Sequence, residues 1–327
     1  MKTDHKRILL ACILLGLLLS SCAGGASAGG NLREVTLPVG YIPNIQFAPL
    51  YVAMEKGYFR EAGVDLTIDY SYETDALALV GAGKLDFALV SGEQVLLGRA
   101  QQLPIVNVLA WYQKYPVGIA SLASAGIKSP DDLRGKRIGT PILSGASYVG
   151  MEALLAAGGL KDSDVQVDTI GFNQVESLVA GREDAVVVYV ANEPVQLRAQ
   201  GYDVNVMPVS DYLTLVSNGM ITNETVLKEE PELVGGMVSA LLKGIQDTMS
   251  DPEEAYQISK KYVENLANAD EAAQKAVLAE SIKLWSSDQL GYSRAEAWTN
   301  MQDVLLSMKL IQSPLDLTKA YTNEFIP

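Results

Sequence analysis

The sequence predicts an α/β protein of two lobes, with mostly parallel sheets and a C-terminal helical segment, and three observations support this. Strand-like apolar runs alternate with helix-like runs from residue 34 to residue 212, the pattern of parallel sheets covered by helices. After residue 225, apolar positions recur at three- and four-residue spacing, which indicates helices. A body of about 300 residues exceeds what one hydrophobic core usually serves, so two lobes are expected.

The N-terminal segment has the pattern of a secretory signal peptide. A basic start precedes the apolar stretch 8–19, which is short for a membrane span. The stretch ends in LSSC, which resembles the lipobox of bacterial lipoproteins, so we expect a signal peptide over 1–21 and a lipidated Cys22. An ordinary signal with an incidental cysteine is the alternative. The Gly/Ala/Ser-rich residues 22–33 are expected to form a flexible tether.

Removal of the signal peptide excludes several kinds of chemistry. His5 is the only histidine and Cys12 one of two cysteines, and both lie in the predicted signal, while Cys22 is assigned to lipid. Serine–histidine triads, papain-like pairs, histidine zinc sites and structural disulfides all need residues that the processed chain would lack. The net charge of −14 argues against a nucleic acid as partner.

The first lobe is predicted to begin with residues 34–114. Strands are expected at 35–39, 64–69, 85–90 and 105–110, and helices at 48–56, 74–82 and 93–101. Two short crossings, near 112–117 and 212–217, are expected to join this lobe to the second one.

The second lobe is predicted over residues 115–212. The sequence SPDD at 129–132 indicates a helix start, with serine at the N-cap, proline next and acids in the first turn. Strands are expected at 136–140, 165–170, 185–190 and 204–208, and helices at 146–157, 174–180 and 193–200.

Residues 213–327 are predicted to return to the first lobe and to end in helices. The expected helices are 232–249, 253–265, 269–285 and 294–308.

Aromatic and amide side chains recur where the predicted strands end. GYIPNIQFAPL (40–50) follows the first strand and WYQKY (111–115) the fourth, and the chain has 15 Tyr against 5 Phe. Ligands of open α/β sheets bind beyond the carboxyl ends of the strands, so both lobes would direct these loops into one cleft. Tyr and Trp can stack on a flat ring and also bond its edge, and amides offer paired donors and acceptors.

Two acids are also expected at the cleft, and some of the polar side chains have a purely structural explanation. Glu93 and Glu193 are the acids that we expect to face the cleft, as hydrogen-bond acceptors rather than as a catalytic pair. A tyrosine at a strand end is more often a rim residue than a ligand contact, and Asn173 and Asn192 are equally explained as helix caps. The convergence of these side chains on one cleft favours a binding site.

Three spaced motifs resemble those of a known family. GYIPNIQFAPLYVAMEKGYFREAGVDLTID, VGAGKLDFALVSGEQVL and IKSPDDLRGKRIGT are similar to the substrate-binding proteins of ABC importers, in the clade that serves nitrate, taurine, alkanesulfonates and the thiamine pyrimidine. The resemblance covers residues 34–225. It implies a two-lobed periplasmic-binding-protein (Venus-flytrap, type II-like) fold, a small-molecule ligand, a membrane permease as partner and a monomeric state.

Within this clade the stretch VSGEQVLLGRAQQLPIVNVLAWYQKYP looks most like the vitamin-binding members. Anion-binding members are expected to have small polar and basic side chains where this chain has Trp111 and Tyr112. The resemblance therefore implies riboflavin as ligand, a thiamine-type pyrimidine as the second choice and a sulfonate or nitrate as the third. The ligand contacts that it implies are Asn44, Glu93, Trp111, Tyr112, Tyr115, Tyr148, Asn173 and Asn192.

The alternative from another class is a pyrimidine-making enzyme of the same fold. That enzyme relies on histidine and a cysteine cluster, which the processed chain would lack, and export would separate the protein from cytoplasmic substrates. An adhesive lipoprotein would not need a cleft lined at every strand end. We therefore expect a lipid-anchored, extracytoplasmic receptor with no catalytic residue, no metal and no cofactor.

Overall fold

The computed structural model describes residues 32–327. The predicted signal peptide (1–21), Cys22 and most of the predicted tether (22–33) lie outside the described residues. Within the described part the chain forms two five-stranded sheets. No helix in this same part is both long enough and apolar enough to cross a membrane.

The first sheet combines four early strands with one that returns from much later in the chain. Its strands are β1 (Arg33–Val39), β2 (Val64–Tyr70), β3 (Ala88–Val90), β4 (Ile105–Ala110) and β10 (Gly219–Asn223). Their order across the sheet is β2-β1-β3-β10-β4. β1 is parallel to β2 and β3, whereas β10 is antiparallel to both of its neighbours, β3 and β4.

The second sheet repeats this arrangement. Its strands are β5 (Val117–Leu122), β6 (Arg137–Thr140), β7 (Gln166–Thr169), β8 (Ala185–Tyr189) and β9 (Val204–Pro208). The order β7-β6-β8-β5-β9 again places one antiparallel strand, β5, in the fourth position. Because only β10 and β5 oppose the rest, the expectation of mostly parallel sheets is confirmed.

The two antiparallel strands are the strands that the sequence analysis did not identify; the short helices α3 (Tyr58–Glu61) and α9 (Glu224–Glu229) were not predicted either. It assigned the neighbourhoods of β5 and β10 to crossings between the lobes. Both strands lie in the middle of their sheets, and all but the last residue of β5 and every residue of β10 are buried. A strand buried on both faces shows no polar–apolar alternation, and β5 and β10 also lack a continuous apolar run, because glycine, serine, threonine or asparagine interrupts them.

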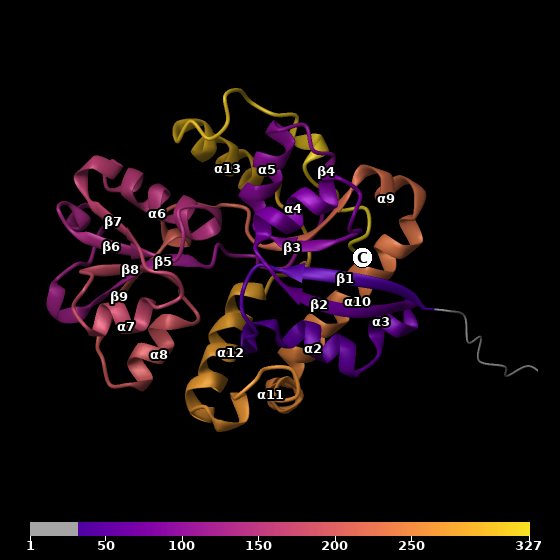
Figure 1. The fold of residues 1–327 in the computed structure, drawn as a ribbon, viewed down its shortest axis with the longest axis horizontal. Helices are drawn as coiled ribbons and strands as arrows, with labels where there is room; N and C mark the ends of the chain where they lie inside the picture. The colour runs from indigo at the N-terminus through magenta and orange to yellow at the C-terminus, as the bar shows by residue number, and fades with distance from the viewer. Residues whose placement is uncertain (1–31) are drawn as a thin grey trace, which may run out of the picture. The chain divides into compact units, whose positions relative to one another are not determined.

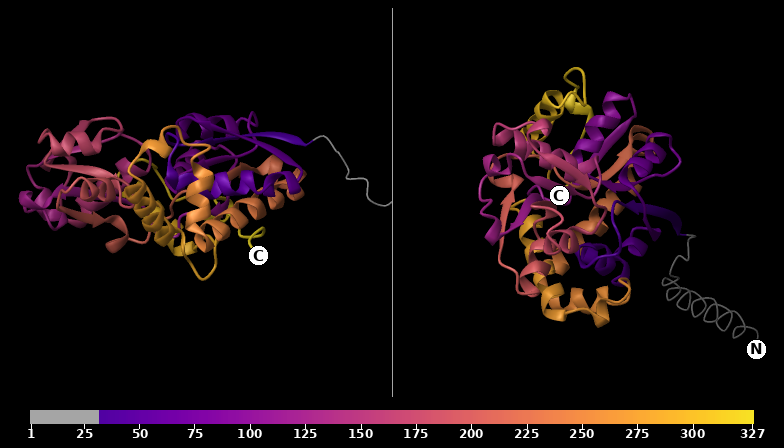
Figure 2. Two further views of the ribbon diagram at one scale, coloured as in Figure 1. Left: turned by 90° about the horizontal axis from the view of Figure 1, so that it is seen from below. Right: turned by 60° about the vertical axis from the view of Figure 1, so that its left-hand side comes forward.

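Helices cover both faces of the first sheet, and the two together form the first lobe. On one face lie α2, α3, α10, α11 and α12, and on the other α4, α5 and α13 (Figure 1). With α9, the first lobe has nine of these helices within the described residues. Four precede the second lobe in the chain: α2 (Ala48–Glu55), α3 (Tyr58–Glu61), α4 (Glu73–Gly81) and α5 (Gly92–Ala100). Two come next after β10: α9 (Glu224–Glu229) and α10 (Pro231–Ser250). The last three are α11 (Pro252–Ser259), α12 (Glu271–Trp285) and α13 (Ala295–Ser307). Both views of Figure 2 show these C-terminal helices, in orange and yellow, against the indigo first lobe.

The second lobe consists of the second sheet and three helices. These are α6 (Gly145–Ala157), α7 (Gln174–Val179) and α8 (Glu193–Ala199). α7 and α8 share a small apolar core with the sheet, in which Leu178 and Leu197 pack against Val186. The helix start predicted at 129–132 is a 3-10 turn, in which Ser129 and Asp132 form a capping box.

Short 3-10 turns mark several connections. They are η1 (Ile45–Phe47), η2 (Ala123–Ala125), η3 (Pro130–Leu133), η4 (Asp162–Asp164), η5 (Val209–Asp211), η6 (Leu266–Asn268) and η7 (Leu317–Lys319).

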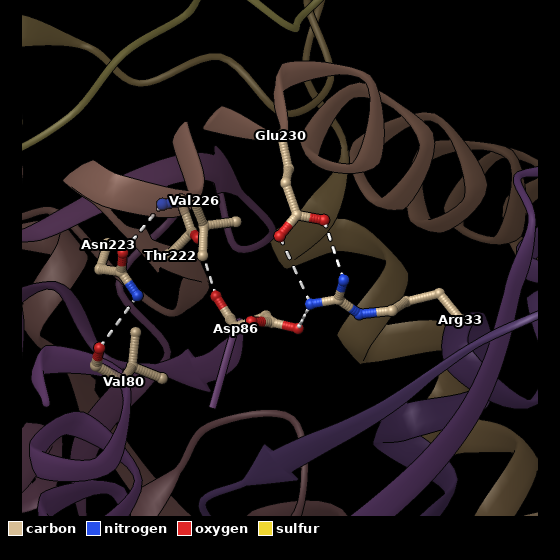
Figure 3. A network of polar contacts seen from close by, with 7 residues as sticks. All are labelled: Arg33, Val80, Asp86, Thr222, Asn223, Val226 and Glu230. Atoms are coloured by element: carbon tan, nitrogen blue, oxygen red, sulfur yellow. Dashed lines mark hydrogen bonds and ion pairs between the residues drawn. The ribbon is translucent and has the colours of Figure 1, made fainter. Parts of the chain in front are cut away.

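Polar contacts hold β10 and the following helix to the early strands of the first lobe (Figure 3). The Arg33 guanidinium bridges Asp86 at 2.8 Å and Glu230 at 3.0 Å. Thr222 donates its hydroxyl to the Asp86 carbonyl at 2.7 Å. The Asn223 side chain accepts from two N–H groups of the first turn of α9 and donates to the end of α4. These bonds position the returning chain, and with it the second crossing.

The two crossings between the lobes lie side by side. The backbone N–H groups of Trp111 and Tyr112 both donate to the Asn218 carbonyl, at 3.0 and 3.1 Å. α13 also contacts the second crossing, because Val216 donates its N–H to the carbonyl of Ala297 at 3.2 Å. The predicted lobe boundaries at 114 and 212 fall in these segments, and independent movement of the lobes stays a prediction.

Candidate ligand-binding site

A cleft lies where the loops at the strand ends of both sheets meet. It encloses about 1140 Å³ of atom-free space, its open mouth included. The lining comes from the loops after β1, β2 and β4, from β3 and the start of α5, and from Asn218 before β10 in the first lobe, and from the end of β8 and the loops after β6, β7 and β8 in the second. Aromatic, amide, hydroxyl and acidic side chains make up its polar part, and within residues 32–327 no Lys, Arg or His contributes to it.

An aromatic wall forms one side of the cleft. Trp111, only 2% exposed, lies 6.2 Å from Phe47 and is supported from behind by Trp285 at 5.9 Å between ring centroids. Tyr112 follows it and meets Tyr189 of the second lobe edge-on, at 6.4 Å and 88°. Burial raises the pKa of Tyr112 to about 12, so its phenol is neutral and keeps its proton at physiological pH.

Two hydrogen-bond donors in this wall are unused. The Trp111 indole Nε1 and the Gln46 amide Nε2 are buried and have no hydrogen-bond partner within residues 32–327. Both residues line the cleft. A buried donor without a partner is costly, so these groups are suited to bonding acceptor atoms of a ligand.

The mouth of the cleft carries a contact between the lobes. Tyr41, after β1, meets Phe172, after β7, edge-to-face with their ring centroids 4.9 Å apart. Phe172 is 40% exposed, and Ile42 and Leu143 in the neighbouring strand-end loops are more exposed still. The rim is therefore apolar on both lobes.

The start of α6 contributes backbone groups. Ser144 at the N-cap has an extended conformation, and Gly145 has φ +66°, a value that favours glycine. The first residues of the helix line the cleft, and N–H groups of a first helical turn have no partner within the helix. This segment can therefore donate to ligand oxygen atoms.

The second lobe also brings a buried acid to the cleft. Glu193 accepts the backbone N–H of Tyr189 at 2.9 Å and the Asn192 amide at 3.0 Å. Burial raises the pKa of Glu193 to about 7. Asn192 in turn accepts from Gln196 at 2.8 Å, so both of these side chains are held in place by their own helix.

The first lobe contributes an acid that the sequence analysis missed. It expected Glu93 and Glu193 to be the acids in the cleft, but Glu73 lines it and Glu93 does not. Glu73 accepts from the backbone N–H and the hydroxyl of Ser91, at 3.1 and 2.5 Å. Gly40 makes this position possible, because a Cβ there would lie 2.3 Å from the Glu73 Cγ. As the first residue of α4, Glu73 has the sequence pattern of an ordinary helix start, which concealed it.

Three of the eight predicted ligand contacts line the cleft. These are Trp111, Tyr112 and Asn192. Their contact with a ligand stays a prediction, but the structure brings them together from the first crossing and the second lobe.

The other five predicted contacts do not line the cleft. Asn44 caps η1 by accepting the N–H of Gln46 at 3.0 Å, and Tyr115 is buried and donates to the carbonyl of Ala146 at 3.0 Å. Glu93 is buried behind Ser91. These three support residues that do line the cleft, because strand-end position fixes the edge of the sheet but not the direction of each side chain.

Tyr148 and Asn173 directly follow lining residues but are not part of the lining themselves. Tyr148 is partly buried on α6, near Glu152. Asn173 is exposed and donates its amide to the carbonyl of Ile170 at 3.0 Å. Direct contact of these two with a ligand stays a prediction without support from the lining.

Other lining residues were not among the predicted ligand contacts. They include Tyr41, Gln46, Phe47, Tyr189 and Asn218. Gln46 and Phe47 belong to the quoted strand-end loop, so their position was a usable signal. Asn218 directly precedes β10, and overlooking that strand hid its place.

Two sheets of the same order, crossed twice and with a cleft at their strand ends, define the class of two-lobed periplasmic binding proteins. The structure is similar to the alkanesulfonate-binding protein SsuA of Xanthomonas axonopodis pv. citri bound to MOPS. The TM-score is 0.71 at 14% identity, with 91% of this chain and 100% of that chain covered. This similarity shows the fold alone, and it confirms the predicted fold class.

Sequence comparison identifies the family. Residues 44–255 match the model of the "NMT1/THI5 like" family. The chain is 36% identical to the riboflavin-binding protein RibY of Chloroflexus aurantiacus, over 98% of each chain. It is 32% identical to the formylaminopyrimidine-binding protein of Halalkalibacterium halodurans, over 81% of this chain and 79% of that protein. The protein belongs to the NMT1/THI5-like family, and the predicted resemblance to importer substrate-binding proteins of this clade is confirmed.

Proposed function

We propose that this protein captures riboflavin outside the cytoplasm and delivers it to an importer in the membrane. The observation that carries the proposal is the aromatic wall with two unused donors, set in a cleft without basic side chains. The similarity to a riboflavin-binding protein over nearly the whole chain supports the choice of ligand.

The chemistry of riboflavin matches the cleft. Its flat tricycle suits stacking on Trp111 and Tyr112, and its carbonyl and ring nitrogen acceptors suit the free donors of Trp111 and Gln46. Its ribityl chain carries several hydroxyls, which suit the hydroxyl and backbone groups at Ser144–Ser147. The tricycle and the chain together need a long cleft with one apolar and one polar end.

A thiamine-type pyrimidine is the second candidate, supported by the similarity to a formylaminopyrimidine-binding protein. A single pyrimidine ring would engage only part of the aromatic wall. A sulfonate or nitrate, the third candidate, is disfavoured by charge. Glu73 and Glu193 line the cleft and no cationic side chain within residues 32–327 offsets them, so an anion would lose its hydration beside two acids without a positive charge to compensate.

A role in binding fits the chemistry of the chain better than a role in catalysis. Its one histidine and both cysteines precede residue 32, so the described lobes contain neither residue type. The described residues contain no cluster of three or more acidic, histidine or cysteine side chains placed to hold a metal. An enzyme that relies on histidine and a cysteine cluster has no counterpart for those groups in the cleft.

Delivery to a permease is part of the proposal. The two adjacent crossings would act as the hinge, and the lobes would close on the ligand through the rim contact of Tyr41 and Phe172. A lipid on Cys22 would hold the monomeric receptor at the membrane by the tether. Cys22→Ser is expected to release processed protein or to block processing; processed protein that stays on the membrane would contradict the anchor.

Calorimetric titration tests which ligand the protein binds. Riboflavin, a formylaminopyrimidine and an alkanesulfonate are titrated separately into the purified protein. We expect riboflavin to bind at one site per chain, and we expect the formylaminopyrimidine and the alkanesulfonate to bind weakly or not at all. Binding of the pyrimidine without riboflavin would establish the second candidate, and binding of the sulfonate alone would overturn the charge argument.

A further inference from the structure

Two carboxyl groups share one serine hydroxyl at the floor of the cleft. Ser91 is the single residue between β3 and α5. Its Oγ donates to Glu73 Oε2 at 2.5 Å and also contacts Glu93 Oε1. Ser91 and Glu93 have no exposed surface. Glu73, from α4, lies on the cleft side of this trio and lines the cleft, whereas Glu93, from α5, lies behind it.

The number of protons follows from these contacts. A serine hydroxyl has one proton, and the contact with Glu73 uses it, so the contact with Glu93 needs a proton from the Glu93 carboxyl. The other Glu93 oxygen is buried without a hydrogen-bond partner within residues 32–327, which an ionised carboxylate would tolerate poorly. Burial, together with the charge of Glu73, raises the pKa of Glu93 to about 8.

The other groups that face the trio carry no charge. The phenols of Tyr115 and Tyr189 are the remaining titratable neighbours, and burial raises the pKa of each well above its usual value. Asn218 is neutral and donates its amide to Glu73 Oε1 at 3.4 Å. Burial also raises the pKa of Glu73, and the two acids titrate as a pair. The assignment of the charge rests on the contacts: Glu73 accepts both the N–H and the hydroxyl of Ser91, whereas the contact between Ser91 and Glu93 needs the proton of Glu93.

The negative charge therefore belongs to the acid that faces the cleft. Glu73 Oε2 is used by Ser91, whereas Oε1 has only the long contact to Asn218. A carboxylate oxygen accepts more than one hydrogen bond, so Oε1 retains capacity for a donor in the cleft. Beside it stands the Asn218 amide, so the wall presents an acceptor next to a donor.

We infer that the Glu73 carboxylate accepts an N–H group of the ligand, and that Glu93 is a positioning residue which acts on Glu73 through Ser91. The inference rests on the proposed function and specifies its ligand chemistry: a heterocycle with a ring N–H next to a carbonyl. The imide edge of riboflavin has this pattern, with the N–H directed to Glu73 and the carbonyl to Asn218. An ionised acceptor makes this bond stronger than a neutral one would.

The first test changes the ligand and leaves the protein unaltered. Riboflavin and 3-methylriboflavin, which lacks the imide N–H, are titrated into the wild-type chain at pH 7. We expect the methylated compound to bind at least about tenfold more weakly, because the carboxylate loses its donor. This comparison needs no variant to fold.

The second test changes the two acids separately. Glu73→Gln removes the charge and is expected to weaken riboflavin binding roughly ten- to hundredfold and to narrow the discrimination against the methylated ligand. Glu93→Ala removes the side chain that contacts Ser91 and is expected to weaken binding at pH 7, whereas Glu93→Gln, which imitates the protonated acid, is expected to restore much of that loss. Glu176→Gln, an exposed change on α7, controls for the loss of one negative charge.

The pH profile separates positioning from mere structural support. At pH 9 the wild-type pair has lost its last proton, so its affinity is expected to fall about tenfold from pH 7, following a pKa of about 8. Glu93→Gln has no proton to lose and is expected to keep its affinity. Both proteins meet the same ligand at each pH, so ionisation of the ligand cancels in the comparison.

The outcomes distinguish the two proposals. Absence of riboflavin binding to wild type overturns the proposed function and this inference with it. Riboflavin binding without discrimination against the methylated ligand, or without loss in Glu73→Gln, overturns the inference alone. If Glu93→Gln binds riboflavin more weakly than wild type by the same factor at pH 7 and at pH 9, Glu93 has only a packing role. The infrared difference spectrum between wild type and Glu93→Gln, recorded without ligand, tests the proton: it is expected to contain the carbonyl band of one buried protonated carboxyl, and its absence from the difference would contradict the assignment to Glu93.

Discussion

The two lobes contribute different chemistry to the same cleft. The first lobe and the adjoining crossing supply the large rings and the free donors, in Phe47, Trp111 and Gln46. The second lobe supplies mainly small residues and backbone groups at Ser144–Ser147, with Phe172 at the rim. The repeated sheet order thus supports unlike surfaces, and we predict that the first lobe contributes more to ligand choice and the second lobe more to covering the ligand.

The largest expected effect is that of Trp111→Ala. Trp111 is nearly buried and packs against Trp285, so its loss should lower the free energy of unfolding by about 3–5 kcal/mol. The lost stacking face should weaken riboflavin binding by about 1–3 kcal/mol, by analogy with base–aromatic stacking. Chemical denaturation and titration measure the two effects. An unchanged affinity in folded Trp111→Ala would remove the aromatic wall from the site.

A second expected effect compares the buried acids of the two lobes. Burial raises the pKa of Glu93 to about 8 and that of Glu193 to about 7, from a usual value of 4.5. The folded state then binds more protons than the unfolded state between these values, so the free energy of unfolding should fall as pH rises from about 4.5 to 8. Denaturant unfolding across this range is the measurement.

Matched variants locate this pH dependence. Glu93→Gln and Glu193→Gln should each make the decline shallower, with the Glu193 variant acting mainly below pH 7. A stability that rises through this range in the wild-type chain would show that both acids are ionised in the folded state.

A smaller effect is expected from Asn44→Ala in the first lobe. The side chain caps η1, and loss of such a cap costs about 1 kcal/mol of stability. Affinity should fall by less than this, because Gln46 and Phe47 shift only indirectly. Thermal unfolding and titration distinguish the two. A loss of affinity much larger than the loss of stability would restore Asn44 as a direct ligand contact.

The smallest effect is expected from Phe172→Ala in the second lobe. The side chain is 40% exposed, so stability should hardly change, and loss of its contact with Tyr41 should cost about 0.5–1.5 kcal/mol of the closed form. Stopped-flow measurement should show faster ligand release with little change in association. An effect as large as that of Trp111→Ala would contradict the division of roles between the lobes.

Much of the fold could be predicted from the sequence, because local signals coincide with element ends. The helix predicted at 232–249 is α10, Pro231–Ser250. The strand predicted at 204–208 is β9, Val204–Pro208. Alternation and helical spacing report which face of an element is buried, and most elements here have one buried face. β5 and β10 are the exceptions, because their sequences VGIASL and GMITN mix glycine and polar residues with apolar ones and show neither alternation nor the apolar run that marks β8.

The candidate site could be predicted less well. Trp111 and Asn192 were expected at the cleft and line it, since strand-end position places a loop at the correct edge. Tyr115 occupies an equivalent position but turns inward to Ala146. Glu73 depends on Gly40 and Ser91, which are distant in sequence and meet only in the folded chain. Side-chain direction and such pairings are tertiary properties that no local pattern contains.

Flavin fluorescence during titration of riboflavin into the wild-type protein tests the central claim most directly. Stacking between riboflavin and the electron-rich rings of Trp111 and Tyr112 should abolish most of the fluorescence, with saturation at one ligand per chain. Saturable binding that leaves the fluorescence intact would place riboflavin away from the aromatic wall. Fluorescence that stays unchanged because riboflavin does not bind would contradict the account as a whole.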